Sequence, residues 1–172
     1  MSLRRWLAVV VATLTMTLAT APSAAASSAG ESLWRAEEWT DFEGRTWTAE
    51  DLAGRVVLLD FWATWCAPCL AELPHLRDLH ERYGDRGLVI VGVALDAIER
   101  RDLRSFLLRH DVDWPQVHER DGTGAAFAQR FAVEAVPVTV LVDREGRMIA
   151  RDLRGKALAK VIGTLLPGDA SR

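Results

Sequence analysis

The sequence predicts one α/β domain in which helices flank a central mixed β-sheet. Two observations support this fold class. Apolar runs of strand length alternate with segments whose apolar residues recur at helical spacing. After two such strand and helix pairs, two short strands around a turn are followed by a last helix. That order is typical of α/β layers around a mixed sheet.

The first 26 residues have the order of a secretory signal peptide. Arg4 and Arg5 are positive, Trp6 to Ala19 is a run of apolar residues and threonines, and Ala24 to Ala26 supplies small residues for cleavage. The apolar run is short for a membrane span, although an uncleaved N-terminal anchor is the alternative reading. We therefore expect an exported protein, in the periplasm or on the extracytoplasmic face of a membrane.

The rest of the chain divides into a tether (27–38), one domain (39–167) and a C-terminal tail (168–172). The net charge of the whole chain is −3, and removal of the signal peptide with its two arginines makes the product more acidic. This charge argues against nucleic acid as a partner.

The elements of the first half of the domain follow from their residue types. Trp39–Phe42 and Arg45–Thr48 flank Glu43-Gly44 as a small hairpin. Val56–Trp62 is mostly apolar, as in a strand buried on both faces. Ala67–Tyr83 carries an apolar stripe at helical spacing and stops at Gly84, and Leu88–Ala94 is a second buried strand.

The second half continues the alternation. We expect helices over Glu99–His110 and Thr123–Phe131. Val138–Val142 and Met148–Leu153 form strands around a turn at Asp143 to Gly146, which makes an antiparallel hairpin. Lys156–Leu166 closes the domain as a helix.

Cys66 and Cys69 are the only cysteines of the chain. Cys66 follows a buried strand and opens a helix, where unpaired amides and the positive end of the helix favour a thiolate. Cys69 lies one turn further, close enough for a disulfide. Pro68 stiffens the first turn. This geometry indicates Cys66 as the attacking thiol and Cys69 as the resolving thiol of a redox-active pair.

Two other uses of the cysteines fit less well. A structural zinc ion needs four ligands, and the chain has no second cysteine pair. A purely structural disulfide across so few residues restrains little chain entropy. We therefore expect no bound metal and no cofactor.

The segment "Phe-Trp-Ala-Thr-Trp-Cys-Ala-Pro-Cys-Leu-Ala-Glu-Leu-Pro" (61–74) resembles the thioredoxin superfamily and, more narrowly, the exported TlpA/ResA-like thiol-disulfide oxidoreductases. The resemblance extends from Trp39 to Pro167. It implies a thioredoxin-like fold with an added N-terminal β-hairpin and an inserted helix and strand, for which Asp96 to Val117 is available.

The resemblance also implies substrate-binding residues. Val136-Pro137-Val138-Thr139 is similar to the loop whose proline is cis and packs against the dithiol, which frees the Val136 backbone to pair with a client peptide. Ala135 and Val138 stand where relatives often have Gly and Thr. Trp65 is expected beside Cys66, with Trp62 packed beneath it.

Two carboxylates are candidates for the acid/base group. Glu72 matches an acidic residue that ResA-like proteins place beneath the dithiol, and Asp60 matches the buried aspartate of thioredoxin. Burial raises the pKa of a carboxyl group, so either residue is suited to take the proton of Cys69. The sequence does not rank them.

The resemblance favours a reductase that opens disulfides in exported client proteins, of the cytochrome c maturation or copper-site assembly type, with electrons from a membrane thiol donor. A disulfide-forming oxidant is one alternative. A metallochaperone holding Cu(I) between Cys66 and Cys69 is another, since thiolates suit Cu(I), but only three methionines are present. A peroxidase is disfavoured because Ala63 stands where that class has Thr or Ser.

Overall fold

The computed structural model describes residues 32–34 and 38–166. The predicted signal peptide (1–26), much of the tether and the whole of the tail (168–172) lie outside the described residues. Within the described part, no helix combines the length and the apolar character needed to cross a bilayer. Residues 32–34 fall within the predicted tether, and there Trp34 is buried and the Leu33 amide donates a hydrogen bond to the Gly146 carbonyl.

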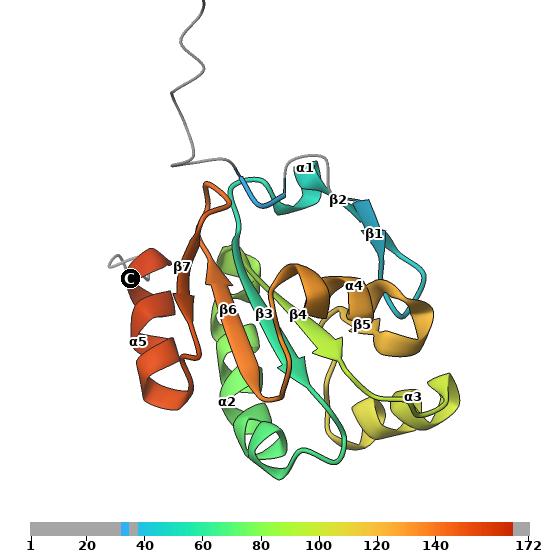
Figure 1. Ribbon diagram of the computed structural model, residues 1–172. Helices are drawn as coiled ribbons and strands as arrows, with labels where there is room; N and C mark the ends of the chain where they lie inside the picture. Colours follow the sequence, from blue (N-terminus) through green and yellow to red (C-terminus); the bar gives the residue numbers. More distant parts are fainter. Residues whose placement is uncertain (1–31, 35–37, 167–172) are drawn as a thin grey trace, which may run out of the picture.

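The predicted fold class is confirmed: helices cover both faces of a five-stranded mixed sheet, and a separate two-stranded sheet precedes it (Figure 1). The strand order is β5-β4-β3-β6-β7, with β3 parallel to β4 and antiparallel to β6. The strands are β1 (Glu38–Thr40), β2 (Thr46–Thr48), β3 (Val56–Trp62), β4 (Leu88–Ala94), β5 (Gln116–His118), β6 (Val138–Val142) and β7 (Met148–Arg151).

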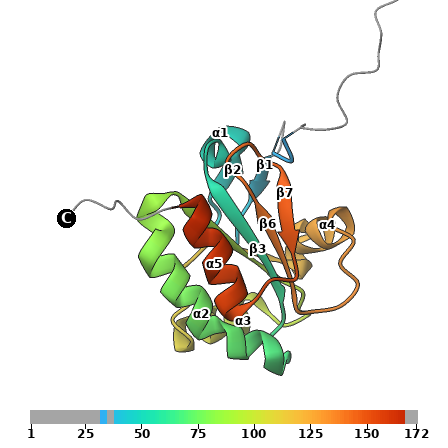
Figure 2. The same ribbon diagram turned by 90° about the vertical axis from the view of Figure 1, so that its left-hand side faces the viewer.

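The helices divide between the faces of the sheet. They are α1 (Ala49–Leu52), α2 (Ala67–Tyr83), α3 (Arg100–Arg109), α4 (Thr123–Arg130) and α5 (Gly155–Leu165), with short 3₁₀ turns at Gly84–Arg86 and Glu119–Asp121. Helices α2 and α5 lie side by side on one face, as Figure 2 shows, and bury Val56 and Leu58 of β3. Helix α4 and the N-terminal hairpin bury Val57, Leu59 and Phe61 on the other face.

Two sequence expectations were inaccurate for physical reasons, and one short helix was missed. The N-terminal hairpin has a longer turn than Glu43-Gly44, because the Asp41 carboxylate accepts the amides of Glu43 and Arg45 and ends the pairing at Thr40 and Thr46. The predicted strand at 148–153 ends at Arg151, since Asp152 has a positive φ. Helix α1 was not expected; a capping box between Thr48 and Asp51 supports it.

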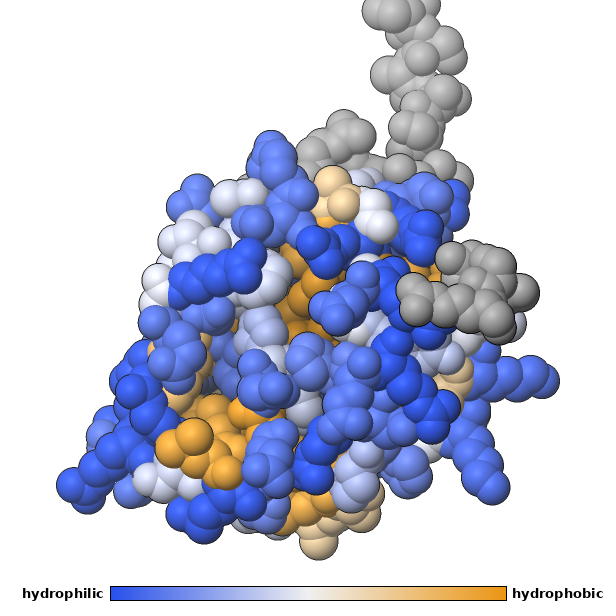
Figure 3. Space-filling model, turned by 180° about the vertical axis from the view of Figure 1, so that it is seen from behind, coloured by the Kyte–Doolittle hydropathy of each residue, from blue (hydrophilic) through white to orange (hydrophobic). Residues whose placement is uncertain are grey.

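The inserted helix and strand are α3 and β5, and the strand extends one residue beyond the expected insert, to His118. Helix α3 packs Leu103, Phe106 and Leu107 against the carboxyl end of β3 and the cysteines. The face opposite to that of Figure 1 is mainly hydrophilic, with an apolar area on the side where α3 lies (Figure 3). Because α3 packs against the cysteines, the insert covers one side of the cysteine site.

Candidate functional site

Cys66 occupies the N-cap position of α2, directly after the loop that leaves β3 (Figure 1). Its Sγ accepts a hydrogen bond from the Cys69 amide at 3.3 Å, so an otherwise unpaired amide of the first turn points at the sulfur. A disulfide joins Cys66 to Cys69, and their Cα atoms are 5.3 Å apart. An amide and the positive end of a helix beside a sulfur are surroundings that favour a reactive thiolate.

The disulfide is buried in an apolar cluster. Both cysteines are only 3% exposed. They pack with Trp62, Ala63, Ala94 and the apolar side chains of α3. Helix α3 packs against the disulfide from one side and leaves little of either sulfur exposed. Trp65, by contrast, is 71% exposed beside Cys66, so a large apolar surface marks the site from outside.

The Val136–Pro137 peptide bond is cis, and both residues are partly exposed. The Val136 side chain packs against the cluster that contains both cysteines. The loop before β6 and the dithiol are therefore neighbours, although about 70 residues separate them in the chain.

Asp60 is 6% exposed and lies in the middle of β3. Its neighbours on the same face of the strand are Leu58, which packs against α2 and α5, and Trp62, which packs against the cysteines. Asp60 thus lies beneath the first half of α2. Burial raises the pKa of Asp60 to about 7, the nearby carboxylate of Glu72 adds to the rise, and the guanidinium of Arg154 opposes it.

Glu72 differs from Asp60 in its surroundings. Its side chain is 21% exposed, and one oxygen accepts the amide of Gly155 at 2.9 Å, at the N-terminus of α5. His75 Nδ1 lies 3.7 Å from the same oxygen. Glu72 is therefore hydrogen-bonded and partly exposed to solvent, whereas Asp60 is almost fully buried.

Arg154 and Asp96 also belong to this region, and sequence reasoning assigned neither a role. Arg154 donates a hydrogen bond to the carbonyl of Pro137. Asp96, after β4, accepts the backbone amide of Thr64 at 2.5 Å. A buried acid such as Asp60 indicates that a positively charged side chain lies nearby. The sequence does not identify which arginine provides that charge. Among the described residues, no three His, Cys, Asp or Glu side chains are grouped as metal ligands.

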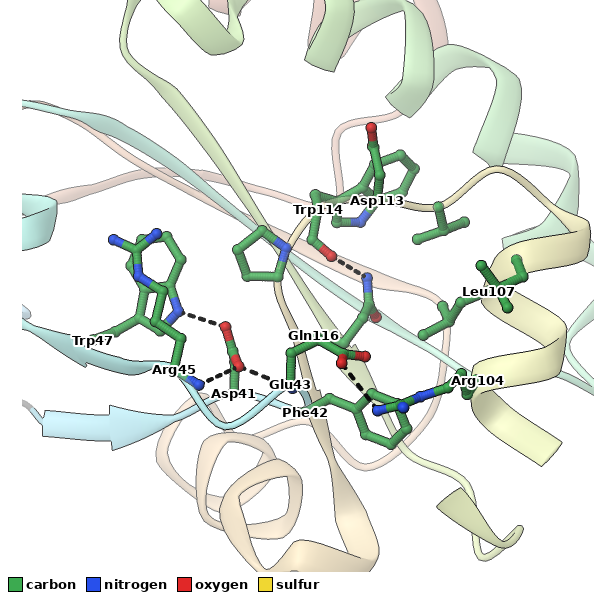
Figure 4. Close-up of a pocket in the computed structure, with 13 residues that line it drawn as sticks. Asp41, Phe42, Glu43, Arg45, Trp47, Arg104, Leu107, Asp113, Trp114 and Gln116 are labelled. Atoms are coloured by element: carbon green, nitrogen blue, oxygen red, sulfur yellow. Dashed lines mark hydrogen bonds and ion pairs between the residues drawn. The ribbon is translucent and has the colours of Figure 1, made fainter. Parts of the chain in front are cut away.

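A cavity of about 560 Å³ lies between the N-terminal hairpin, α3 and the segment before β5 (Figure 4). Its lining includes Phe42 and Gln116 and neither cysteine. The Gln116 amide oxygen accepts the indole N–H of Trp62 at 3.0 Å, and its nitrogen donates to the Trp114 carbonyl. Gln116 thereby connects the wall of this cavity to the aromatic residue beneath the disulfide.

Comparison with known proteins gives concordant results. A family model described as AhpC/TSA matches residues 30–151. A thiol-disulfide oxidoreductase ResA of Bacillus cereus (strain ZK / E33L) is 32% identical over 113 residues, which are 65% of this chain and 62% of that protein. The match thus spans just under two thirds of that relative's length.

Two solved structures share the fold. The thioredoxin domain of a thiol-disulfide oxidoreductase from Bacteroides vulgatus superposes with a TM-score of 0.68 and 28% identity, covering 81% of this chain and 99% of that domain. A thiol:disulfide interchange protein from Bacteroides sp. gives a TM-score of 0.67 and 27% identity, covering 78% and 88%. The fold is thus that of thioredoxin-like proteins.

Proposed function

This chain belongs to the AhpC/TSA family, and from that membership and the site geometry we propose that it is a thiol-disulfide oxidoreductase acting through Cys66 and Cys69. The observation that carries the proposal is the Cys66–Cys69 disulfide at the N-cap of α2, beside the loop at Val136 and Pro137. The names of the similar proteins agree with this activity.

The favoured direction is reduction of a client disulfide. The Cys66 thiolate attacks one client sulfur, forms a mixed disulfide and releases the other client sulfur as a thiolate. The Cys69 thiolate then attacks the Cys66 sulfur, which releases the second client thiolate and restores the Cys66–Cys69 disulfide. Two electrons pass from the dithiol to the client, and a donor of thiol electrons must reduce the pair again.

Asp60 is our candidate for the group that takes the proton of Cys69. A base works best when its pKa lies near the working pH, and burial raises the pKa of Asp60 to about 7. The proton passes on to the released client thiolate, so charge and atoms balance over the cycle. Glu72 raises the pKa of Asp60 and binds the amide of Gly155, which makes it a modulating neighbour in this scheme.

Client binding is assigned to two surfaces that flank the disulfide. The backbone of Val136 pairs with an extended client segment, and the exposed Trp65 ring covers the client's apolar side chains. We infer that the clients are exported proteins with disulfides, including cysteine pairs of the cytochrome c or copper-site type, and that a membrane thiol donor supplies electrons. The signal-like N-terminus supports export to the periplasm, with or without an anchor.

The redox potential tests the direction. The pair is equilibrated with glutathione and followed by tryptophan fluorescence, since Trp62 packs with the cysteines. A reductase is expected near thioredoxin's value of about −270 mV, whereas a value near about −120 mV would assign a disulfide-forming role. Trapping clients on Cys66 in a Cys69→Ala variant then identifies them. Tight stoichiometric Cu(I) binding would favour a metallochaperone, and peroxide turnover would favour a peroxidase despite Ala63.

A further inference from the structure

Arg154 lies where the client-binding loop and the buried carboxylates meet. It precedes α5, and one nitrogen of its guanidinium donates a hydrogen bond to the carbonyl of Pro137. The next residue, Gly155, donates its amide to Glu72 at 2.9 Å. The loop, the start of α5 and the first half of α2 are therefore joined through two consecutive residues.

The guanidinium of Arg154 is also the cation that acts on Asp60. It opposes the rise of the Asp60 pKa that burial and Glu72 cause. The cross-strand neighbours of Asp60, Gly92 on β4 and Thr139 on β6, carry no charge. On α2, Glu72 is the acid that acts on Asp60, and His75 lies 3.7 Å from its carboxylate. The charge balance around Asp60 thus depends on Arg154.

One nitrogen of the Arg154 guanidinium makes no hydrogen bond among the described residues. The Nε of Arg154 is buried and has no hydrogen-bond acceptor among the described residues. A buried donor without an acceptor is costly, so a movement that gives it one is favoured. Ionisation of Asp60 creates a negative charge nearby and strengthens the pull on the guanidinium. That pull competes with the hydrogen bond to Pro137.

We propose that Arg154 is a positioning residue that couples the protonation of Asp60 to the position of the Val136–Pro137 loop. When Asp60 holds a proton, the guanidinium is free to hold the Pro137 carbonyl. When Asp60 is ionised, the guanidinium is drawn toward it and the loop loosens. Because such coupling is reciprocal, a client that moves the loop changes the proton affinity of Asp60. The client half of this proposal rests on the proposed function.

The first experiment needs no client. In the oxidised protein, the carboxyl carbon of Asp60 and the backbone amides of Val136 and Val138 are followed by NMR from pH 4 to 10. In the unmodified protein, the amides should shift with the same midpoint as Asp60. Arg154→Met should raise the Asp60 midpoint and remove the matching amide shift. Arg154→Lys keeps the positive charge and is the more conservative substitution. It should leave the titration midpoint of Asp60 near its original value and weaken the shift of the Val136 and Val138 amides.

Arg151→Met is the matched control. It removes an equal charge from the neighbouring strand, where Arg151 binds the carbonyls of Phe131 and Ala132 instead. Its Asp60 midpoint and amide shifts should be unchanged. An unchanged Asp60 midpoint in Arg154→Met would overturn the proposal. So would amide shifts of Val136 and Val138 in the unmodified protein that do not follow the titration of Asp60.

A second experiment tests the consequence for clients. Reduction of a peptide disulfide by both Arg154 variants should show a KM about fivefold higher, because the loop is less fixed, while Arg151→Met keeps the original KM. A KM unchanged in both Arg154 variants would overturn the link to client binding. Should the unmodified protein fail to exchange disulfides at all, the proposed function would fail, and the NMR titration would still decide the role of Arg154.

Discussion

The carboxylate of Asp96 holds Thr64 by two hydrogen bonds, accepting the backbone amide at 2.5 Å and the hydroxyl at 3.3 Å. Asp96 is 2% exposed and follows β4, while Thr64 lies two residues before Cys66. A buried carboxylate is costly unless its oxygens are hydrogen-bonded. The pair therefore fastens the loop that presents Trp65 and Cys66 to the end of the neighbouring strand.

We expect Asp96→Ala to release this loop. A hydrogen bond to a charged group contributes about 1.5–3 kcal/mol, so the Thr64 amide should exchange its hydrogen roughly tenfold to a hundredfold faster. Thr64→Val removes the hydroxyl bond alone and should change the exchange much less. Hydrogen exchange followed by NMR measures both variants. Equal protection of the Thr64 amide in Asp96→Ala and the unmodified protein would show that Asp96 does not fasten the loop.

Asp60 should make the stability of the domain depend on pH. Its pKa is 3.8 when unperturbed and about 7 in the folded protein, so between these values the folded state binds one more proton than the unfolded chain. The free energy of unfolding therefore falls as the pH rises through this window, by about 1.4 kcal/mol per pH unit and about 4 kcal/mol in total. The loss is complete above the folded pKa.

Asp60→Asn tests this prediction by removing the titrating group. Urea unfolding of the oxidised protein should give similar stabilities for both proteins near pH 4. At pH 8 the variant should be more stable, by up to about 4 kcal/mol. Glu72→Gln is a control that leaves Asp60 in place, and its stability should still fall with rising pH. Parallel curves for Asp60→Asn and the unmodified protein would contradict the raised pKa.

The central elements of the fold were predictable because their own residues specify them. The bounds of β3, α2, β4 and β6 agree with the sequence analysis, since each is a mostly apolar run or a regular apolar stripe bounded by turn residues. The strand ends that were predicted wrongly depend on side-chain hydrogen bonds and backbone angles, which the periodicity of apolar residues does not reveal. Asp41 closes the first turn by capping two amides, and Asp152 ends β7 with a positive φ.

The candidate site was predictable where a motif or a resemblance marks its residues, which includes the cis loop at Val136 and Pro137. Cys66, Cys69 and Trp65 lie in a single motif, and the position of Asp60 follows from an acid in an apolar strand. The partners that complete the site come from distant segments: Arg154 reaches Pro137, and Asp96 reaches Thr64. Arginine and aspartate are common on surfaces, so only the tertiary structure distinguishes these two from solvated charges.

Trp65 should contribute to client binding and little to stability. Its side chain is 71% exposed, so Trp65→Ala should change the free energy of unfolding by about 0.5 kcal/mol or less. If its ring covers client side chains, the KM for a peptide disulfide should rise about tenfold. Leu108→Ala is the control, because Leu108 is equally exposed, at 73%, on α3. A similar KM for the two variants would argue against a client surface at Trp65.

The side chain of Gln116 on the neighbouring strand leaves room only for glycine at position 92. A Cβ atom at this position would lie 2.0 Å from Oε1 and 2.5 Å from Cδ of Gln116, whose amide occupies the space. Gly92 is also the cross-strand neighbour of Asp60. The absence of a side chain on β4 thus lets Gln116 reach Trp62 across the sheet. Gly92→Ala should displace that amide and lower the stability by about 1–3 kcal/mol.

A double-mutant cycle separates this clash from a general effect of alanine on β4. Gln116→Ala should itself cost about 1–3 kcal/mol, because the buried indole N–H of Trp62 loses its acceptor. In that background the space above Gly92 is empty, so adding the methyl group should cost nothing further. Urea unfolding of the four proteins should therefore give a coupling energy of at least about 1 kcal/mol between the two positions. Strictly additive losses would mean that Gly92 is needed for a reason other than the Gln116 side chain.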